Sequence, residues 1–333
     1  MTKKLFLRAT AINACFDSID YNNPHLEISG DGLDVVLDDT ESNKFIDNPN
    51  GYKLPNTASP KFAKLEALLD QERKIVNLSV GDSFYKCLVG VSVFGGFRNK
   101  LKEFSQSINS YGSLEFQLIE DISTASTIAS YLSFRNDAKT VGKLPNETTN
   151  AFVARLGDTC AGWIQSGTAI KAVQAGKPIP VKIGPLANSN FFSAGLSLHN
   201  TKVQAMRRRR YIALVVDDDK LIRTLAGFRD TSGEADQNEN ILHEYHTTIE
   251  NNPDSLLITS IKAKPNTVPF EECLSASISV EKLRNSSLNL MTQNCRDLLN
   301  NSSGCLHLND LLRAVGHFVN NLNFQIKSSS NKS

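Results

Sequence analysis

Apolar and polar residues alternate over the first forty residues and then change to a helical spacing. The alternation predicts strands over 3–15 and 25–38, and a Gly-Asp-Gly turn signal interrupts the second one. Residues 40–60 are polar and rich in Asn and Pro, which is typical of a long surface loop. A helix is then predicted from Ser59, because Pro60 suits its first turn. The apolar residues at helical spacing in it are Phe62, Leu65, Leu68 and Leu69.

The chain up to residue 175 continues with apolar runs and amphipathic segments. Strands are predicted for "KIVNLSV", "FYKCLVGVSVF" and "SLEFQLIED". Helices are predicted for "GGFRNKLKEFSQSINSYG" and "ISTASTIASYLSF". A long helix is predicted over 148–175, although Gly157, Gly162 and Gly167 lie inside it and each lowers helix stability.

The second half follows a Pro- and Gly-containing break at 176–185. Two strands and three helices are predicted there: strands at 210–216 and 256–263, and helices at 235–251, 280–300 and 308–322. Strands and helices therefore alternate, which predicts an α/β or α+β fold with a mixed sheet, flanking helices and two subdomains. We see no internal repeat in the sequence.

The break at 176–185 sets the predicted domain organisation. An N-terminal α/β domain is expected at 1–178, a C-terminal α/β domain at 179–325, and a polar, disordered tail at 326–333.

Charge and cysteine content limit the classes of function. The chain has 36 Lys and Arg against 35 Asp and Glu, a net charge of +1, so contact with a polyanion must be a local patch. Six cysteines without a CxxC pair predict reduced thiols and a cytoplasmic protein. No run approaches about eighteen uninterrupted apolar residues, so no membrane contact is expected.

Four consecutive arginines, 207–210, are the main candidate for a binding surface. Their planar guanidinium groups suit phosphate oxygens, although only alternate ones share a face of an extended strand. Bases can also stack on tyrosine, and phosphate contacts would make binding strongly salt-dependent. The alternative is that the arginines pair with the aspartates at 217–219 and other carboxylates. The predicted nucleic-acid contacts are Arg207, Arg208, Arg209, Arg210, Tyr211 and Lys202.

A second basic segment follows Gly95 and Gly96. Its helix carries Arg98, Lys100 and Lys102, and glycines at a helix N-terminus let phosphate approach the backbone amides. This helix is the predicted second contact with nucleic acid. The spacing matches neither a P-loop nor a dinucleotide fingerprint, so a tight turn is the alternative.

The phrase "YIALVVDDDKLIRTL" resembles the opening of a response-regulator receiver domain, in which a strand ends in acidic residues that hold Mg²⁺. "EADQNENILHEYHTTIENNPDSLLITSI" resembles the second helix and third strand of that family, and "SGCLHLNDLLRAVGHFV" its closing strand and helix. The resemblance covers 211–322. It implies a receiver-like α/β module that works through protein contacts.

Two positions depart from the receiver pattern. Thr259, Ser260 and Ile261 stand where the family has its phosphoacceptor aspartate, and His307 is nearest to the expected lysine. The resemblance therefore implies a degenerate module without phosphorylation.

The aspartates of the same region favour a third chemistry. Asp217 and Asp218 end a strand, and carboxylates at such positions, joined by Asp254, can bind Mg²⁺ in a nuclease. "PDSLLITSIKAK" also resembles the acidic-strand-lysine pattern of restriction-type nucleases, with Lys262 as its lysine. Ser260 stands at the second acidic position, which removes one metal ligand.

A predicted helical face combines two histidines with two glutamates. Glu239, His243, His246 and Glu250 follow one another at i, i+4, i+7 and i+11, and such residues can hold zinc or iron. An exposed polar face is the alternative.

The sequence favours a cytoplasmic nucleic-acid-binding protein of the ribonucleoprotein type, with RNA or DNA as its partner and neither catalysis nor a cofactor required. The alternatives are a signalling protein with protein partners and a Mg²⁺-dependent nuclease.

Overall fold

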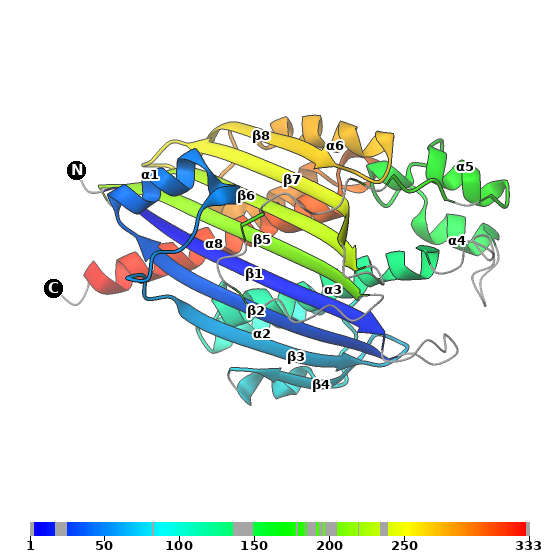
Figure 1. The fold of residues 1–333 in the computed structure, drawn as a ribbon, viewed down its shortest axis with the longest axis horizontal. Coiled ribbons are helices and arrows are strands. Elements are labelled where there is room, and N and C mark those ends of the chain that lie inside the picture. Colours follow the sequence, from blue (N-terminus) through cyan, green and yellow to red (C-terminus); the bar gives the residue numbers. More distant parts are fainter. Residues whose placement is uncertain are drawn as a thin grey trace.

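A computed structural model of the 333-residue chain contains one large antiparallel sheet with helices on both faces (Figure 1). The residues that the structure describes are 3–16, 25–81, 83–135, 149–177, 179–182, 184, 191–192, 196, 205–218, 220–233 and 239–330.

The sheet has eight strands in the order β4-β3-β2-β1-β5-β6-β7-β8, and every neighbouring pair is antiparallel. The strands of the first half are β1 (Lys4–Phe16), β2 (Leu26–Leu37), β3 (Lys61–Leu69) and β4 (Ile75–Val80). Those of the second half are β5 (Ala205–Asp217), β6 (Lys220–Gly233), β7 (Glu239–Asn251) and β8 (Ile258–Thr267).

The two halves repeat one topology, a four-strand meander that leads into helices, and β1 pairs with β5 at the centre. One ion pair is repeated as well. Arg8 in β1 lies opposite Asp34 in β2, and Arg208 in β5 lies opposite Asp230 in β6. Each arginine donates through Nε and Nη2 to both oxygens of its aspartate. The fold therefore contains an internal repeat, and the expectation of none is wrong.

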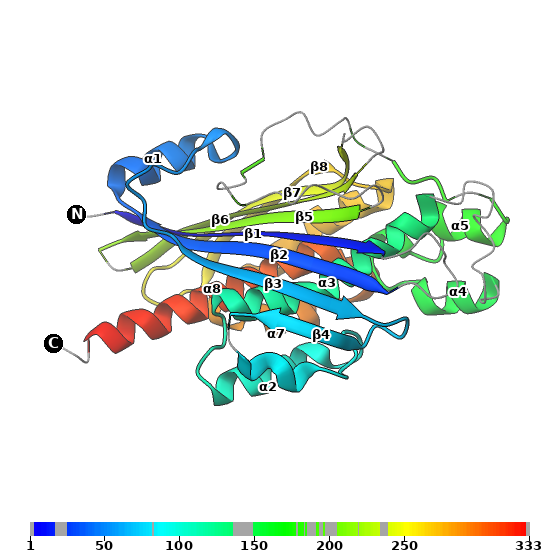
Figure 2. The same ribbon diagram turned by 60° about the horizontal axis from the view of Figure 1, so that its bottom comes forward.

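Most helices cover one face of the sheet, and α1 lies on the opposite face (Figures 1 and 2). The long helices α3 and α8 lie across the face opposite α1, together with α2 and α7. The helices are α1 (Asp39–Asp47), α2 (Phe97–Ser107), α3 (Leu114–Arg135), α4 (Thr149–Leu156), α5 (Thr168–Gln174), α6 (Leu274–Ser279), α7 (Met291–Leu298) and α8 (Leu306–Ser330). Short 3₁₀ helices are η1 (Pro49–Gly51), η2 (Ser83–Leu88), η3 (Ala161–Trp163), η4 (Glu271–Cys273), η5 (Val280–Leu283), η6 (Leu288–Leu290) and η7 (Asn301–Ser303).

Alternation along the central strands produces a separate core on each face of the sheet. In β1, Leu5 and Leu7 pack with Tyr211 and Phe45 on the α1 side. Ile12 belongs to the core beneath α2 and α3. Because both faces are covered, the central strands bury polar as well as apolar side chains, and this places charged groups inside the molecule.

The predicted fold class, α/β or α+β with flanking helices, is confirmed, but the sheet is antiparallel throughout instead of mixed. The predicted strands at 3–15 and 25–38 correspond to β1 and β2, and the predicted last helix to α8. The proposed domain boundary after residue 178 falls between the two meanders, which β1 and β5 join into one sheet.

Several predicted elements are wrong. The predicted helix at Ser59 is β3, the predicted helix at 235–251 contains β7, and the predicted strand "SLEFQLIED" lies in α3. The predicted loop at 40–60 contains most of α1. The Leu-rich segment of β3 fits both periods, and its pairing with β2 and β4 makes it a strand.

Three other predictions fail at their ends or breaks. The predicted helix at 148–175 is divided into α4, η3 and α5, with breaks near its glycines. The segment "FYKCLVGVSVF" contains η2 instead of a strand. Helix α8 continues to Ser330 through most of the expected disordered tail.

The element order of 211–322 also differs from the alternation that a receiver-like module implies. Four antiparallel strands in succession precede the helices there. Within the described part of the chain, no helix combines the length and the apolar character needed to cross a bilayer.

Candidate active site next to a buried charge network

The four arginines of β5 alternate between the two faces of the sheet, as the strand period requires. Arg208 and Arg210 point toward α3 and α8, where they contact Asp121 and Asp310. Arg207 and Arg209 point to the other face, where both contact Glu239. All four guanidinium groups are therefore paired with carboxylates of the same chain.

Arg208 is completely buried and holds two carboxylates. Its Nε and Nη2 donate to Asp230 at 2.6 and 2.7 Å, and its Nη1 donates to Asp310 at 2.9 Å. Its guanidinium also stacks on the Phe228 ring at 4.5 Å. Burial raises the pKa of Asp230, but the Arg208 charge outweighs burial and holds this pKa well below its ordinary value.

Asp310 of α8 is the centre of the network. Its carboxylate accepts hydrogen bonds from Arg208, Arg210, Arg98 and Arg313. Burial raises the pKa of Asp310, and these guanidinium groups lower it far more. The network therefore joins the helices α2 and α8 to β5 at the middle of the molecule.

Glu120 of α3 forms the far end of the network. It lies 3.0 Å from Nδ1 of His317 and accepts a hydrogen bond from Arg98 at 3.2 Å. Burial raises the pKa of Glu120, while His317 and Arg98 lower it, with a net result of about 2.

Every arginine of the predicted nucleic-acid site is turned inward, at least in part. The exposed fractions of Arg207, Arg208 and Arg210 are 4, 0 and 2%, so the expectation of an exposed arginine patch is wrong. The physical reason is that β5 is a central strand with both faces covered. Arg98 also turns inward, to Glu120 and Asp310.

The remaining predicted contacts do not complete a basic surface. Tyr211 is buried and its hydroxyl lies 3.0 Å from Nδ1 of His246. Lys100 and Lys102 are exposed on α2, and the Lys102 ammonium lies over the Tyr111 ring. Lys202 lies outside the described residues. Binding of nucleic acid stays a prediction, without support from the arginine run.

The predicted Mg²⁺ ligands lie at the end of a hairpin instead of in a site. Asp217 ends β5, and Asp218 is in the turn to β6 with a positive φ of 45°. Asp254 is exposed and pairs with Lys220 at 2.7 Å. In the part of the chain that the structure describes, these aspartates do not form a three-ligand group.

Two histidines and one aspartate form such a group instead, in the middle of the protein. Asp230, His243 and His307 are buried, and one ligand atom of each lies within 4.8 Å of the others. The imidazole rings of His243 and His307 are 3.9 Å apart at their centroids. The group brings together β6, β7 and the first turn of α8.

Each of these imidazoles has a buried ring nitrogen at the group, Nδ1 in His243 beside Asp230 and Nε2 in His307, which has no hydrogen-bond partner. Nδ1 of His243 lies 3.3 Å from Oδ2 of Asp230, within the distance of an ion pair. In His307, the other ring nitrogen, Nδ1, lies 4.0 Å from Sγ of Cys305. Burial lowers the pKa of His307 well below its ordinary value, so this ring is neutral at physiological pH.

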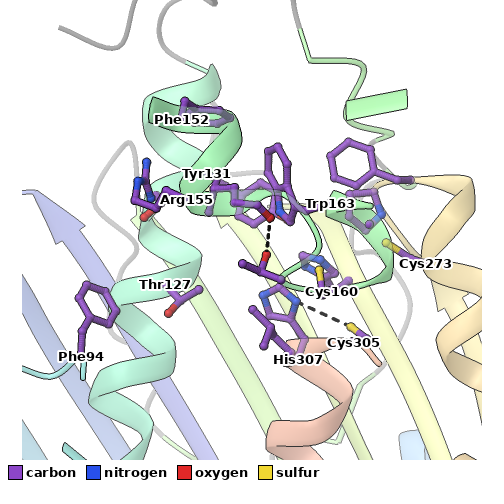
Figure 3. A pocket seen from close by; sticks show the side chains of 18 residues that line it. Phe94, Thr127, Tyr131, Phe152, Arg155, Cys160, Trp163, Cys273, Cys305 and His307 are labelled. Atoms are coloured by element: carbon purple, nitrogen blue, oxygen red, sulfur yellow. Dashed lines mark hydrogen bonds between the residues drawn. The ribbon is translucent and has the colours of Figure 1, made fainter. Parts of the chain in front are cut away.

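A cavity of about 470 Å³ opens onto the two histidines. Figure 3 shows His307 and Cys305 at one end of it, with Tyr131, Phe152 and Trp163 around the opposite part. The lining residues are Phe94, Thr127, Ser130, Tyr131, Phe152, Arg155, Leu156, Thr159, Cys160, Gly162, Trp163, His243, Pro269, Phe270, Cys273, Cys305, Leu306 and His307.

Three cysteine thiols also line this cavity. Burial raises the pKa of Cys160 and of Cys273, and it raises the pKa of Cys305 to about 12. Since the thiolate is the nucleophilic form of cysteine, these groups are unreactive thiols in this state.

The four residues of the predicted metal face at 239–250 do not share one face, because the segment is a strand. His243 lies on the helix-covered side of β7 near Asp230, whereas His246 contacts Tyr211 on the other side. Glu239 pairs with Arg207 and Glu250 with Arg223. Only His243 of that face belongs to the observed group.

Comparison with known proteins adds a family of unknown function. A family model described as a protein of unknown function, DUF2889, matches residues 206–320. The matched range begins in β5 and ends in α8, and it contains Asp230, His243 and His307. No curated protein and no solved structure matches the chain.

Proposed function

We propose that this protein is an enzyme that binds a small, largely apolar molecule in the cavity beside His243 and His307 and carries out acid–base chemistry on it. The observation that supports the proposal is an aromatic-lined cavity that ends at two buried imidazoles, of which His307 has an Nε2 without a hydrogen-bond partner. A buried nitrogen without a partner costs about 1–3 kcal/mol, a cost that a bound ligand would remove.

The size and lining of the cavity favour an aromatic or similarly flat ligand. A volume of about 470 Å³ lies within the range of small-molecule sites. Trp163 makes edge-to-face contacts with Phe152 at 5.8 Å and Phe270 at 5.7 Å, so its walls are rings already fixed by packing. Arg155 lines the cavity and its guanidinium lies over the Phe152 ring. It would place a cation near an acidic substituent of a bound ligand.

The reactive end of the proposed site has a fixed geometry. Arg208 holds Asp230 through two hydrogen bonds, and Asp230 lies beside His243. Groups held in this way lose little entropy when a substrate binds, and a positioned histidine is the commonest acid–base catalyst. A cysteine nucleophile is not part of the proposal, because the cavity thiols are protonated.

The proposed location is a reducing compartment such as the cytoplasm. All six cysteines are free, and four of them are buried. Free thiols in this number are typical of proteins kept reduced.

Ligand binding can be followed with the only tryptophan of the chain, Trp163, because it lies in the cavity wall. Titration with benzoate and phenol should change its fluorescence, whereas glucose should not. Thr127→Phe would fill part of the cavity and should weaken binding by about 10-fold or more. Ser277→Phe is the matched control, since Ser277 is also a half-buried helical hydroxyl bonded to its own helix.

The outcomes of this experiment are distinct. Saturable binding of the aromatic compounds that Thr127→Phe weakens and Ser277→Phe retains supports the proposed site. Equal binding by both variants places the ligand elsewhere, and the absence of any saturable response to aromatic compounds overturns the proposal.

A further inference from the structure

We propose that Asp230, His243 and His307 bind a divalent first-row transition metal ion such as Zn²⁺ at the inner end of the cavity. The proposal deepens the proposed function by naming a cofactor for the same centre. It stands on geometry: three ligand atoms within 4.8 Å, all buried, from three different elements of the fold.

The separations already approach those of a metal site. With metal–ligand bonds of about 2.0–2.1 Å, ligand atoms at tetrahedral angles lie about 3.4 Å apart. Nδ1 of His243 and Oδ2 of Asp230 are 3.3 Å apart. Nε2 of His307 is buried without a hydrogen-bond partner, and the three ligand atoms of the group lie within 4.8 Å of one another, so they would need to approach to about 3.4 Å for three-ligand binding.

The neighbours of the three ligands act as an outer shell. Arg208 fixes both oxygens of Asp230, and each oxygen keeps a lone pair for a metal ion. Cys305 Sγ lies 4.0 Å from Nδ1 of His307, on the side of the ring opposite Nε2. When the thiol sulfur accepts a hydrogen bond from Nδ1–H, Nε2 is free to bind metal.

The ligand set and the access path suit a transition metal. Two imidazoles and one carboxylate are the ligands that Zn²⁺ and Fe²⁺ take with open positions. His243 and His307 both line the cavity, so a substrate could reach such a position. When bound, the metal ion would supply Lewis-acid chemistry and a water molecule of lowered pKa, and the acid–base role would pass from the ligated imidazoles to this water.

The charge of the surroundings limits the ligand that occupies the open position. Among the described residues, four network arginines (Arg98, Arg208, Arg210 and Arg313) face four carboxylates (Glu120, Asp121, Asp230 and Asp310). A divalent cation adds positive charge to this balanced set. We therefore expect hydroxide or an anionic oxygen of the substrate at the open position, which points to an aromatic acid or phenol as substrate.

Metal binding is tested with chelator-treated full-length protein titrated with Co²⁺ and Zn²⁺. The wild type should bind one ion per chain, and Co²⁺ should give visible absorption bands. His243→Asn and His307→Asn should each weaken binding by about 100-fold or more, since even outer-shell changes cost 10- to 100-fold. His246→Asn is the matched control, because His246 lies three residues away in β7 and contacts Tyr211 instead.

The results separate this inference from the proposed function. Loss of binding in both variants and retention in His246→Asn supports the metal site, whereas equal binding by all proteins or no binding by the wild type overturns it. If a variant does not fold, NMR of the Co²⁺-loaded wild type decides: strongly shifted ring N–H signals from two histidines support the site, and their absence refutes it. Aromatic ligand binding to metal-free protein leaves the cavity proposal standing even when no metal binds.

Discussion

Replacement of Arg208 by methionine tests whether the arginine run is an internal ion-pair network. Arg208 and Asp230 are fully buried, and the substitution removes both hydrogen bonds that Asp230 receives from it. Asp310 keeps Arg210 and Arg313, so one carboxylate rather than two is left uncompensated. A buried charge without its partner costs about 3–5 kcal/mol, a large part of the stability of a typical domain.

The neighbouring arginine gives the control. Arg209→Met leaves Glu239 paired with Arg207, so the expected cost is about 1 kcal/mol. Urea unfolding followed by Trp163 fluorescence and circular dichroism measures both free energies of unfolding. Removal of both charges in the double variant Arg208→Met/Asp230→Leu should recover part of the loss, because no unpaired charge remains. A difference between Arg208→Met and Arg209→Met below about 1 kcal/mol would refute the buried network.

Three further outcomes follow from the structure. The pKa of Glu120 is lowered from 4.5 to about 2, so its contribution to stability is present above about pH 4.5 and is lost as pH falls toward 2. Glu120→Gln should therefore flatten this part of an acid-unfolding curve. An unchanged slope would contradict the pairing of Glu120 with His317 and Arg98. Gly112→Ala should destabilise the protein by more than about 2 kcal/mol in urea unfolding, since a Cβ there meets a backbone carbonyl of α8. Gly90→Ala is the control, because Gly90 has a similar positive φ but open space around it, and it should cost about 1–2 kcal/mol. A thiol reagent should modify the exposed Cys87 in the folded protein and Cys305 only on unfolding, and equal rates by mass spectrometry would contradict the burial.

Helix α8 and the central strands β1 and β5 could be predicted from the sequence, whereas β3 and β7 could not. In α8, Leu308, Leu311 and Leu312 form a single apolar stripe, and the predicted helix is present. In β7, both faces are covered, so buried residues follow one another without the alternation that identifies a strand. The same segment also fits a helical period, which produced the wrong prediction at 235–251.

The error in β7 hid the candidate site. A helical interpretation placed His243 with His246, but strand geometry separates them and turns His243 toward Asp230 and His307. Asp230 and His243 lie opposite each other in the β6–β7 pair, and His307 joins them from α8, so the strand register and the packing of α8 reveal the group. The sequence also shows the positive charge of the arginine run, but not its burial, because two carboxylates that pair with Arg208 and Arg210 lie on helices distant in sequence.

That the cavity beside His243 and His307 is the functional centre is tested most directly by crystals soaked with 4-bromobenzoate and measured at the bromine edge. We expect an anomalous peak inside the cavity, between the aromatic walls and the two imidazoles. A peak at another surface, for a compound that binds in solution, would contradict this assignment.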